Sequence, residues 1–219
     1  ALPWRNPIVL AAILAMLMLI FGGFGGMINA SYSMNAMVHN TQWVTGHFHL
    51  IFDGTTVIMY FGAAYYLWPK MTGNALASVK LANTQLWLWF IGMLVLTLPW
   101  HQLGVAGQPR RISSTPYDES LVQTWLTSEA LMIVGGVILF VSALLLVVVL
   151  FKTHGNAQAV AVREVEYADS LHTVARMPHL MNSFGFWVGL IVVYMVASYG
   201  YPIAQFFLLD THGTVPWSI

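Results

Sequence analysis

The sequence predicts an all-α integral membrane protein with five transmembrane helices. Hydrophobic residues make up 58% of the 219 residues and charged residues only 7%, whereas about a quarter of an average soluble domain is charged. Five apolar runs approach or exceed the ~20 residues that a helix needs to cross the hydrocarbon core of a bilayer. We place them at 8–29, 45–68, 81–104, 127–151 and 184–209, in a single membrane domain over 1–219 with no soluble domain.

Each run has its own character. The first contains Gly22-Gly23-Phe24-Gly25-Gly26, which we interpret as a face for close helix packing and not as a phosphate loop, because no strand precedes it. The second follows a histidine-rich stretch. The third carries Trp87, Trp89 and Trp100, as expected of interfacial aromatic belts. The fourth consists mostly of Leu, Val and Phe and is predicted to face lipid.

The placement of Lys and Arg predicts the orientation of these spans. With five spans, the N-terminus and the loops 69–80 and 152–183 share one side, which holds most of the basic residues: Arg5, Lys70, Lys80, Lys152, Arg163 and Arg176. By the positive-inside rule this side is expected to be cytoplasmic, with the N-terminus inside and the C-terminus outside. Arg110 and Arg111 lie on the other side, against the rule, so they call for a local anionic partner.

The most informative stretch is His39-Asn40-Thr41-Gln42-Trp43-Val44-Thr45-Gly46-His47-Phe48-His49-Leu50. Each residue of an α-helix turns by ~100°, so His47 and His49 project roughly 200° apart and cannot bind one metal ion without unwinding the helix. They can hold two different metal centres. A single intramembrane histidine is more simply a hydrogen-bonded polar group, but this pair, with Gly46 beside it, favours metal binding. No cysteine is available as a ligand.

At these residues the chain resembles subunit I of the heme-copper oxygen reductases, most closely the B-type branch, and in particular the C-terminal portion of that subunit. The resemblance extends from Leu2-Pro3-Trp4 to Val215-Pro216-Trp217. It is most specific at His39-Asn40-Thr41, at Gly46-His47-Phe48-His49-Leu50 and at Gly107-Gln108-Pro109-Arg110-Arg111. It implies that the five helices form part of a larger heme-copper oxidase bundle.

The resemblance also implies roles for individual residues. His47 is expected to be the catalytic residue and the ligand of the high-spin heme iron, and His49 an axial ligand of the low-spin heme iron. Arg110 and Arg111 match the pair that binds the heme propionates. His39 and Asn40 match the propionate region, but Asn40 stands where the A-type branch has an acidic magnesium ligand, so no magnesium site is expected. The copper ligands have no match in this chain, and another chain or segment is expected to supply them.

The implied function is that of a terminal oxidase of the cytochrome c oxidase type, which reduces oxygen to water in the respiratory chain and translocates protons. Two hemes and one active-site copper are the implied cofactors. The sequence begins with Ala1, and its first residues do not read as a signal peptide; activity is expected only together with the remaining N-terminal part of subunit I. Subunit II with a dinuclear copper centre, cytochrome c or another electron donor, and the lipids of a prokaryotic cell membrane are the other expected partners. Nothing in the composition indicates nucleic-acid binding.

Alternatives remain open at this point. A portion of nitric oxide reductase would carry the same histidine pair with non-heme iron in place of copper, although Phe48 and the Pro109-Arg110-Arg111 loop favour the oxidase. A proton-conducting transporter, with His47, His49 and Asp53 as its path, belongs to another functional class, as does a structural membrane subunit. Asp53 lies one turn beyond His49, and the resemblance gives it no role.

Overall fold

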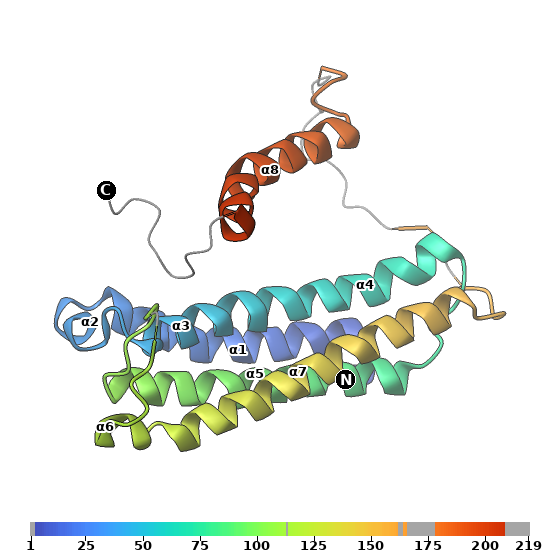
Figure 1. The fold of residues 1–219 in the computed structure, drawn as a ribbon. Coiled ribbons are helices and arrows are strands. Elements are labelled where there is room, and N and C mark those ends of the chain that lie inside the picture. Colours follow the sequence, from blue (N-terminus) through green and yellow to red (C-terminus); the bar gives the residue numbers. More distant parts are fainter. Residues whose placement is uncertain (1–2, 113, 162–163, 166–177, 209–219) are drawn as a thin grey trace. The chain divides into compact units, whose positions relative to one another are not determined.

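The computed structural model describes residues 3–112, 114–161, 164–165 and 178–208, and this part of the chain is almost entirely helical (Figure 1). The elements in chain order are α1 (Pro7–Ala30), α2 (Tyr32–Val38), α3 (Gln42–His49), the π-helix η1 (Leu50–Thr56), α4 (Val57–Thr72), α5 (Val79–Val105), α6 (Ser120–Gln123), α7 (Leu126–His154) and α8 (Phe184–Leu208).

Five helical stretches of the described chain are long and apolar enough to cross a membrane, as predicted. α1, α5, α7 and α8 each provide one. The remaining span, Gln42–Thr72, is 31 residues long and consists of α3, η1 and α4 in continuous succession. It begins three residues before the predicted range 45–68 and ends four residues after it. The predicted all-α membrane fold is therefore confirmed, and the chain is a multi-pass membrane protein.

By its internal contacts the chain divides into two compact units, 1–165 and 166–219. The first unit contains α1 to α7, and the described part of the second contains α8 (Figure 1). That the two units belong to one membrane domain stays a prediction.

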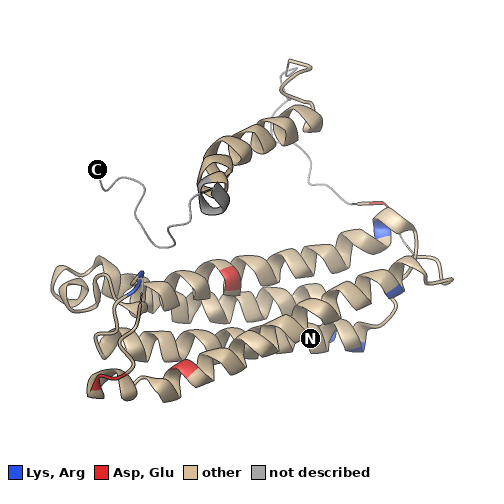
Figure 2. Cartoon of the chain, in the orientation of Figure 1, with Lys and Arg blue, Asp and Glu red and all other residues tan. Residues whose placement is uncertain are grey.

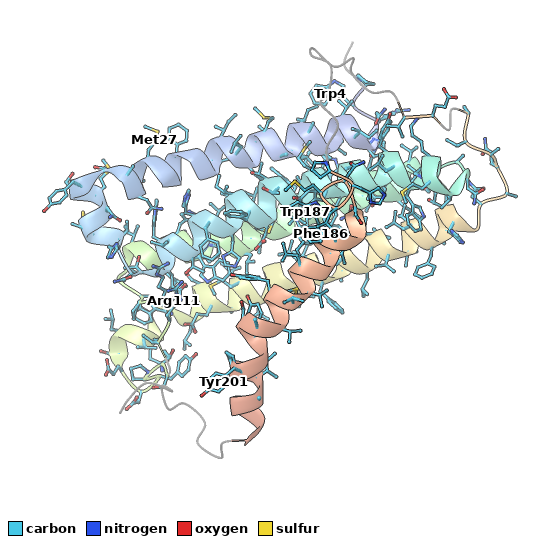
Figure 3. All side chains as sticks on the ribbon, turned by 90° about the horizontal axis from the view of Figure 1, so that it is seen from above. Trp4, Met27, Arg111, Phe186, Trp187 and Tyr201 are labelled. Carbon is cyan, nitrogen blue, oxygen red and sulfur yellow. The ribbon has the colours of Figure 1, made fainter. Side chains whose placement is uncertain are left out.

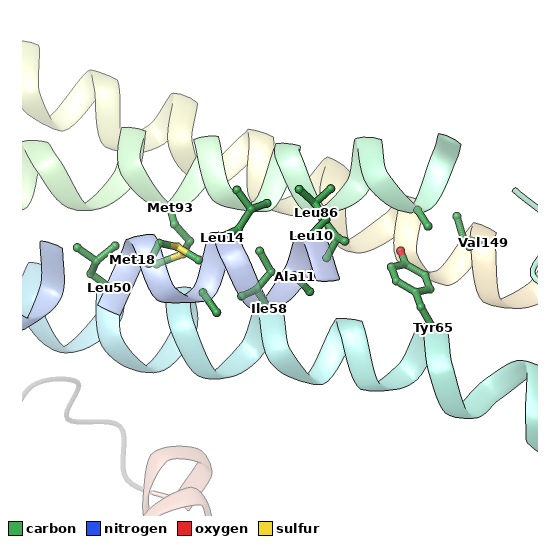
Figure 4. Close-up of a cluster of buried hydrophobic side chains, with 12 residues drawn as sticks. Leu10, Ala11, Leu14, Met18, Leu50, Ile58, Tyr65, Leu86, Met93 and Val149 are labelled. Atoms are coloured by element: carbon green, nitrogen blue, oxygen red, sulfur yellow. The ribbon is translucent and has the colours of Figure 1, made fainter. Parts of the chain in front are cut away.

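In the first unit, α1 packs antiparallel to the span formed by η1 and α4, and α5 packs against α7. A cluster of buried apolar side chains, including Leu14, Met18, Ile58 and Leu86, fills the space between these helices (Figure 4). α7 buries mainly the small residues Gly135, Ser142, Val149 and Thr153. Its large Leu, Val and Phe side chains are mostly exposed, as expected of a lipid-facing helix.

One polar cluster ties three helices together inside this apolar core. Gln85 of α5 is fully buried. Its side chain accepts a hydrogen bond from the Tyr65 hydroxyl of α4 at 2.9 Å and donates one to the Ser142 hydroxyl of α7 at 3.0 Å. Ser142 in turn donates to the Gln85 carbonyl at 2.8 Å. Because the buried polar groups satisfy one another, they fix the relative register of the helices without an unpaired charge.

The loops of the first unit meet at two ends. At the histidine end, defined by residues 39–42 and 106–111, the backbone of Thr41 pairs with that of Pro109. At the lysine end, defined by residues 73–78 and 155–160, Asn74 pairs with Ala159. Figure 2 shows that basic residues gather at both ends, with few charges between them. Folding therefore brings the histidine stretch and the arginine pair to the same end, although about 60 residues separate them.

Candidate functional site

A capping residue sets the start of the histidine helix. Thr41 is buried; its hydroxyl donates to the Val38 carbonyl at 2.7 Å and accepts from the Trp43 amide at 3.3 Å. Thr is a preferred N-cap because its side chain satisfies one of the amides that the first helical turn leaves free. Helix α3 therefore begins at Gln42 and places His47 and His49 in its last turn, directly before the π-helix.

His47 is oriented by α1. Its Nδ1 lies 3.0 Å from the Gly22 carbonyl oxygen. A carbonyl can only accept, so Nδ1 carries the ring proton and Nε2 keeps the lone pair that a metal ion needs. The ring fits because α1 has glycines here: a Cβ built on Gly25 would lie 3.0 Å from His47 Nδ1, and one on Gly26 would lie 3.2 Å from Cε1. The glycine-rich face of α1, which the sequence predicts to pack closely against another helix, thus packs against the imidazole of His47.

His49 has the same tautomer but different neighbours. Its Nδ1 lies 2.8 Å from the Thr45 carbonyl oxygen of its own helix, so Nε2 is again the free nitrogen. The ring packs against Trp100 of α5, with ring centroids 4.7 Å apart. Its Nε2 lies 3.7 Å from Asp53 Oδ2, which is too long for a hydrogen bond. His47 therefore contacts α1 and His49 contacts α5, so the two imidazoles cannot bind one ion together.

The arginine loop, residues 106–111, is hydrogen-bonded to the chain that precedes α3. The Arg110 amide donates to the Asn40 carbonyl at 3.0 Å, and Arg110 Nη2 lies 3.5 Å from Asn40 Oδ1. The Gln42 amide donates to the Gln108 carbonyl at 2.9 Å. Asn40 and Arg111 adopt left-handed backbone conformations, with φ of 61° and 60°. Asn tolerates this region well, whereas a bulky side chain such as that of Arg111 costs about 1–3 kcal/mol there, the kind of strain that clusters at functional sites.

A cationic pocket lies between the arginine loop and the histidine helix. Its volume is about 350 Å³, and its walls are formed by Gln42, Thr45, Phe48, Trp100, Arg110 and Arg111. The Nε of Arg110 is buried and has no hydrogen-bond partner among the described residues. Two guanidinium groups in a partly apolar pocket are suited to carboxylates, which they can bind in bidentate fashion. Figure 3 labels Arg111 at this end of the unit.

The donor set suits the hemes that the sequence resemblance implies. Two imidazoles of α3, each with its Nδ1 bonded to a backbone carbonyl, contact different helices, and two arginines stand one loop away, where carboxylate groups could be neutralised. No group of three or more His, Cys, Asp or Glu residues in the described chain is arranged to hold a metal ion alone. A metal ion bound by His47 or by His49 therefore needs either a macrocycle, which supplies the other ligands itself, or further protein ligands from elsewhere.

His39 and Asn40, which the sequence places near the heme propionates, differ in their contacts with the arginine loop. Asn40 contacts Arg110 directly and so belongs to the arginine loop. His39 is exposed at the end of α2, and its backbone amide donates to the Asn35 carbonyl at 2.7 Å. The structure gives its imidazole no hydrogen bond or ring contact with a described residue. Its predicted place near the propionates stays a prediction.

Several neighbours of the site carry no recognisable signal in the sequence. The Gly22 carbonyl that orients His47 is a backbone group on a different helix. Trp100, which the sequence suggests is an interfacial aromatic, is the ring against which His49 packs. The position of His101 beside Pro99 and Trp100 suggests an interfacial or solvated side chain. It is instead half-buried, with its Nδ1 2.7 Å from the Thr97 carbonyl and its ring edge-on to Trp43.

Comparisons with known proteins show which family the chain resembles in sequence and fold. The family model "Cytochrome C and Quinol oxidase polypeptide I" matches residues 1–138. Cytochrome c oxidase subunit 1 of Thermus thermophilus is 32% identical over 94% of this chain, which covers 38% of that protein. A second, shorter sequence of the same name from Thermus thermophilus is 41% identical over 48% of this chain, which covers 98% of it.

A solved structure gives the same result. A chain from the cryo-EM structure of a heme-copper terminal oxidase dimer superimposes with a TM-score of 0.65 and 27% sequence identity, over 88% of this chain and 34% of the other. This protein thus spans little more than a third of the length of the longer Thermus relative and of the solved chain. By sequence and by fold, the chain belongs to the family of cytochrome c and quinol oxidase polypeptide I, the subunit I of heme-copper oxidases.

Proposed function

We propose that this chain is the C-terminal part of the catalytic subunit of a terminal oxidase, which reduces oxygen to water and translocates protons. His47 would bind the high-spin heme iron and act as the catalytic residue, His49 would bind the low-spin heme iron, and Arg110 and Arg111 would bind the heme propionates. The observation that carries this proposal is the pair of imidazoles, each with Nδ1 bonded to a backbone carbonyl and Nε2 free on a different side of one helix.

The chain's own residues would prepare these ligands before any heme binds. The Gly22 and Thr45 carbonyls fix the tautomer and the plane of each ring, and a hydrogen bond from the remote ring nitrogen makes the ligating nitrogen more basic. When bound, the hemes supply the electron transfer and oxygen chemistry, with potentials set by axial ligation, burial and nearby charge. Arg110 and Arg111 would offset the negative charge of the propionates, which is costly to bury unpaired.

Other components must complete the site. The residues that bind copper and a further protein ligand of the low-spin heme would come from the remaining N-terminal part of subunit I, in keeping with the 38% of the longer Thermus relative that this chain spans. Subunit II with a dinuclear copper centre and cytochrome c or another donor would deliver the electrons. We further propose membership of the B-type branch and location in a prokaryotic cell membrane, with the basic lysine end on the cytoplasmic side.

The test is a pair of substitutions in the assembled complex. His49→Ala should remove the low-spin heme spectrum, and His47→Ala should abolish oxygen reduction while the low-spin spectrum remains. A wild-type complex without a Soret band would contradict the proposal and favour a transporter. Retention of both heme spectra in both variants would favour a structural subunit. Non-heme iron in place of copper, with nitric oxide as the substrate reduced, would identify a nitric oxide reductase.

A further inference from the structure

A second cationic pocket lies at the lysine end, opposite the histidine end: Figure 3 shows Trp4 and Arg111 at opposite ends of the first unit. The pocket has a volume of about 400 Å³ and is lined by Arg5, Val79, Lys80, Asn83, Thr84 and Trp87. Arg5 and Lys80 are exposed, and neither forms an ion pair with a carboxylate of the described residues. The pocket therefore holds two positive charges that this part of the chain leaves uncompensated.

Two helices add to this positive charge with their N-terminal ends. Helix α1 begins at Pro7, two residues after Arg5, and α5 begins at Val79, directly before Lys80. A helix N-terminus carries the equivalent of roughly half a positive charge, which an acidic residue in the first turn often balances. Neither α1 nor α5 has an acidic residue in its first turn. Arg5 and Lys80 line the pocket, and next to each of them in the chain begins a helix whose first turn holds no acidic residue.

The pocket is a built feature of the fold. The Asn83 side chain donates from Nδ2 to the Arg5 carbonyl at 2.9 Å, which fastens the chain before α1 to the side of α5. Asn6 caps α1 by accepting from the Ile8 amide at 2.9 Å, and Ser78 caps α5 by accepting from the Leu81 amide at 3.2 Å. The backbone that carries both cations is therefore held by specific contacts on either side of the pocket.

The surroundings identify the class of anion. Trp87 lines the pocket and is 45% exposed, and Trp4, adjacent to Arg5, is 59% exposed. Exposed tryptophans beside the end of a membrane span are typical of the headgroup level of a bilayer. Val79 and Trp87 give the pocket an apolar wall beside its charges, which a free inorganic anion would leave unused but an acyl chain would cover.

We infer that this pocket binds the phosphodiester of an anionic membrane lipid, with Arg5 and Lys80 contacting the phosphate and Trp87 contacting the glycerol and acyl region. Basic pockets between membrane helices are suited to anionic headgroups, and each basic residue near the membrane surface contributes roughly fivefold to binding. The inference concerns the lysine end alone and does not depend on heme ligation at the histidine end.

The experiment uses the whole complex, purified in mild detergent, with bound lipids counted by native mass spectrometry. The delipidated complex is then titrated with short-chain phosphatidylglycerol, with phosphatidylcholine of the same chain length, and with inorganic phosphate. The test variant is Arg5→Gln combined with Lys80→Gln. Lys152→Gln is the matched control, because Lys152 lies at the same end but does not line the pocket.

Wild type and Lys152→Gln should bind phosphatidylglycerol alike, and the double variant about 25-fold more weakly, since two roughly fivefold contributions are lost. Phosphatidylcholine should bind poorly, and phosphate should not compete. Equal binding by the double variant and the control would overturn the inference, as would phosphatidylcholine binding as tightly as phosphatidylglycerol. Effective competition by phosphate would show that the pocket binds small anions and would contradict a lipid site. If the double variant does not assemble, the wild-type complex alone tests the inference. High salt should then release the bound phosphatidylglycerol. A wild-type complex that takes up no phosphatidylglycerol would overturn the inference.

Discussion

The contact between His47 and α1 can be tested with two glycines of the same helix. Gly25 faces the imidazole: a Cβ at this position would lie 3.0 Å from His47 Nδ1 and 3.5 Å from its Cβ and Cγ. Gly23 faces away, with nothing within 4 Å of the position of its Cβ. The substitutions Gly25→Ala and Gly23→Ala therefore add the same methyl group to α1, but only one of them meets the histidine.

The expected magnitudes follow from this geometry. Alanine in place of glycine inside a helix is favourable by about 0.5–1 kcal/mol, and this gain applies to both variants. At Gly25 the new methyl group must push the ring by a few tenths of an ångström, away from the Gly22 carbonyl. Loss of that hydrogen bond costs about 0.5–1.5 kcal/mol, so Gly25→Ala should have little net effect on stability. The orienting contact of His47 is weakened nevertheless, and because complete loss of such a contact typically weakens metal binding about 10- to 100-fold, we expect an effect at the lower end of this range.

The assay follows stability and heme occupancy in the purified complex. Gly23→Ala should leave both heme spectra and the heme content unchanged. Gly25→Ala should lower retention of the high-spin heme about 10-fold on dilution or in the presence of a heme acceptor protein, the lower end of the effect expected when an orienting contact is disturbed. The low-spin spectrum should stay the same, because His49 is oriented by Thr45 and not by α1. Identical high-spin heme retention in the two variants would refute the idea that α1 orients His47 for ligation.

Three further predictions concern the arginine loop. Arg110→Gln or Arg111→Gln should lower the reduction potential of at least one heme, because a positive charge near the propionates is lost; unaltered redox titrations would contradict propionate binding. Asn40→Ala should leave the content of metals other than heme iron and copper unchanged in elemental analysis, and loss of magnesium or manganese would reveal a site we do not expect. Glu129→Ala removes the acceptor, 2.7 Å away, of the buried Gln108 amide. It should reduce the unfolding free energy by about 1.5–3 kcal/mol, measured as a lower melting temperature in detergent, whereas Glu129→Gln should retain most of the stability.

The sequence was sufficient for the features that depend on composition and chain direction. Apolar runs define the spans because a helix in lipid must satisfy its own backbone groups and present apolar side chains. An up-and-down order of spans places the loop before α3 and the loop after α5 at the same end, so the order of the spans alone brings the histidine stretch and the arginine pair together. The amide of Arg110 indeed lies 3.0 Å from the Asn40 carbonyl.

The details of the site could not be predicted from the sequence because they depend on contacts with backbone groups that are distant in the chain. Nothing in the pattern of residues indicates that a carbonyl 25 positions upstream fixes the tautomer of His47. The left-handed conformation of Arg111 is equally unexpected, since bulky side chains rarely adopt it. The half-buried position of His101 has a related cause: its hydrogen bond to the Thr97 carbonyl satisfies the ring locally, so a polar residue near a helix end does not have to face water.

The π-helix after His49 explains how one span can pack its apolar face against α1 and also direct two histidines to different helices. The buried positions Leu50, Gly54 and Ile58 are four residues apart, and in an α-helix this spacing drifts by ~40° at each step. In η1 the Val57 amide bonds to the Phe52 carbonyl, five residues back, and also to the Gly54 carbonyl, so each residue turns by less than in an α-helix and this wider turn counteracts the drift. The apolar face thus stays against α1 from Leu50 onward, while α3 turns at the ordinary rate and directs its two imidazoles to different helices. Because the π-helix lies between α3 and α4, the part of the span after it packs in the apolar core, and the part before it carries the two histidines.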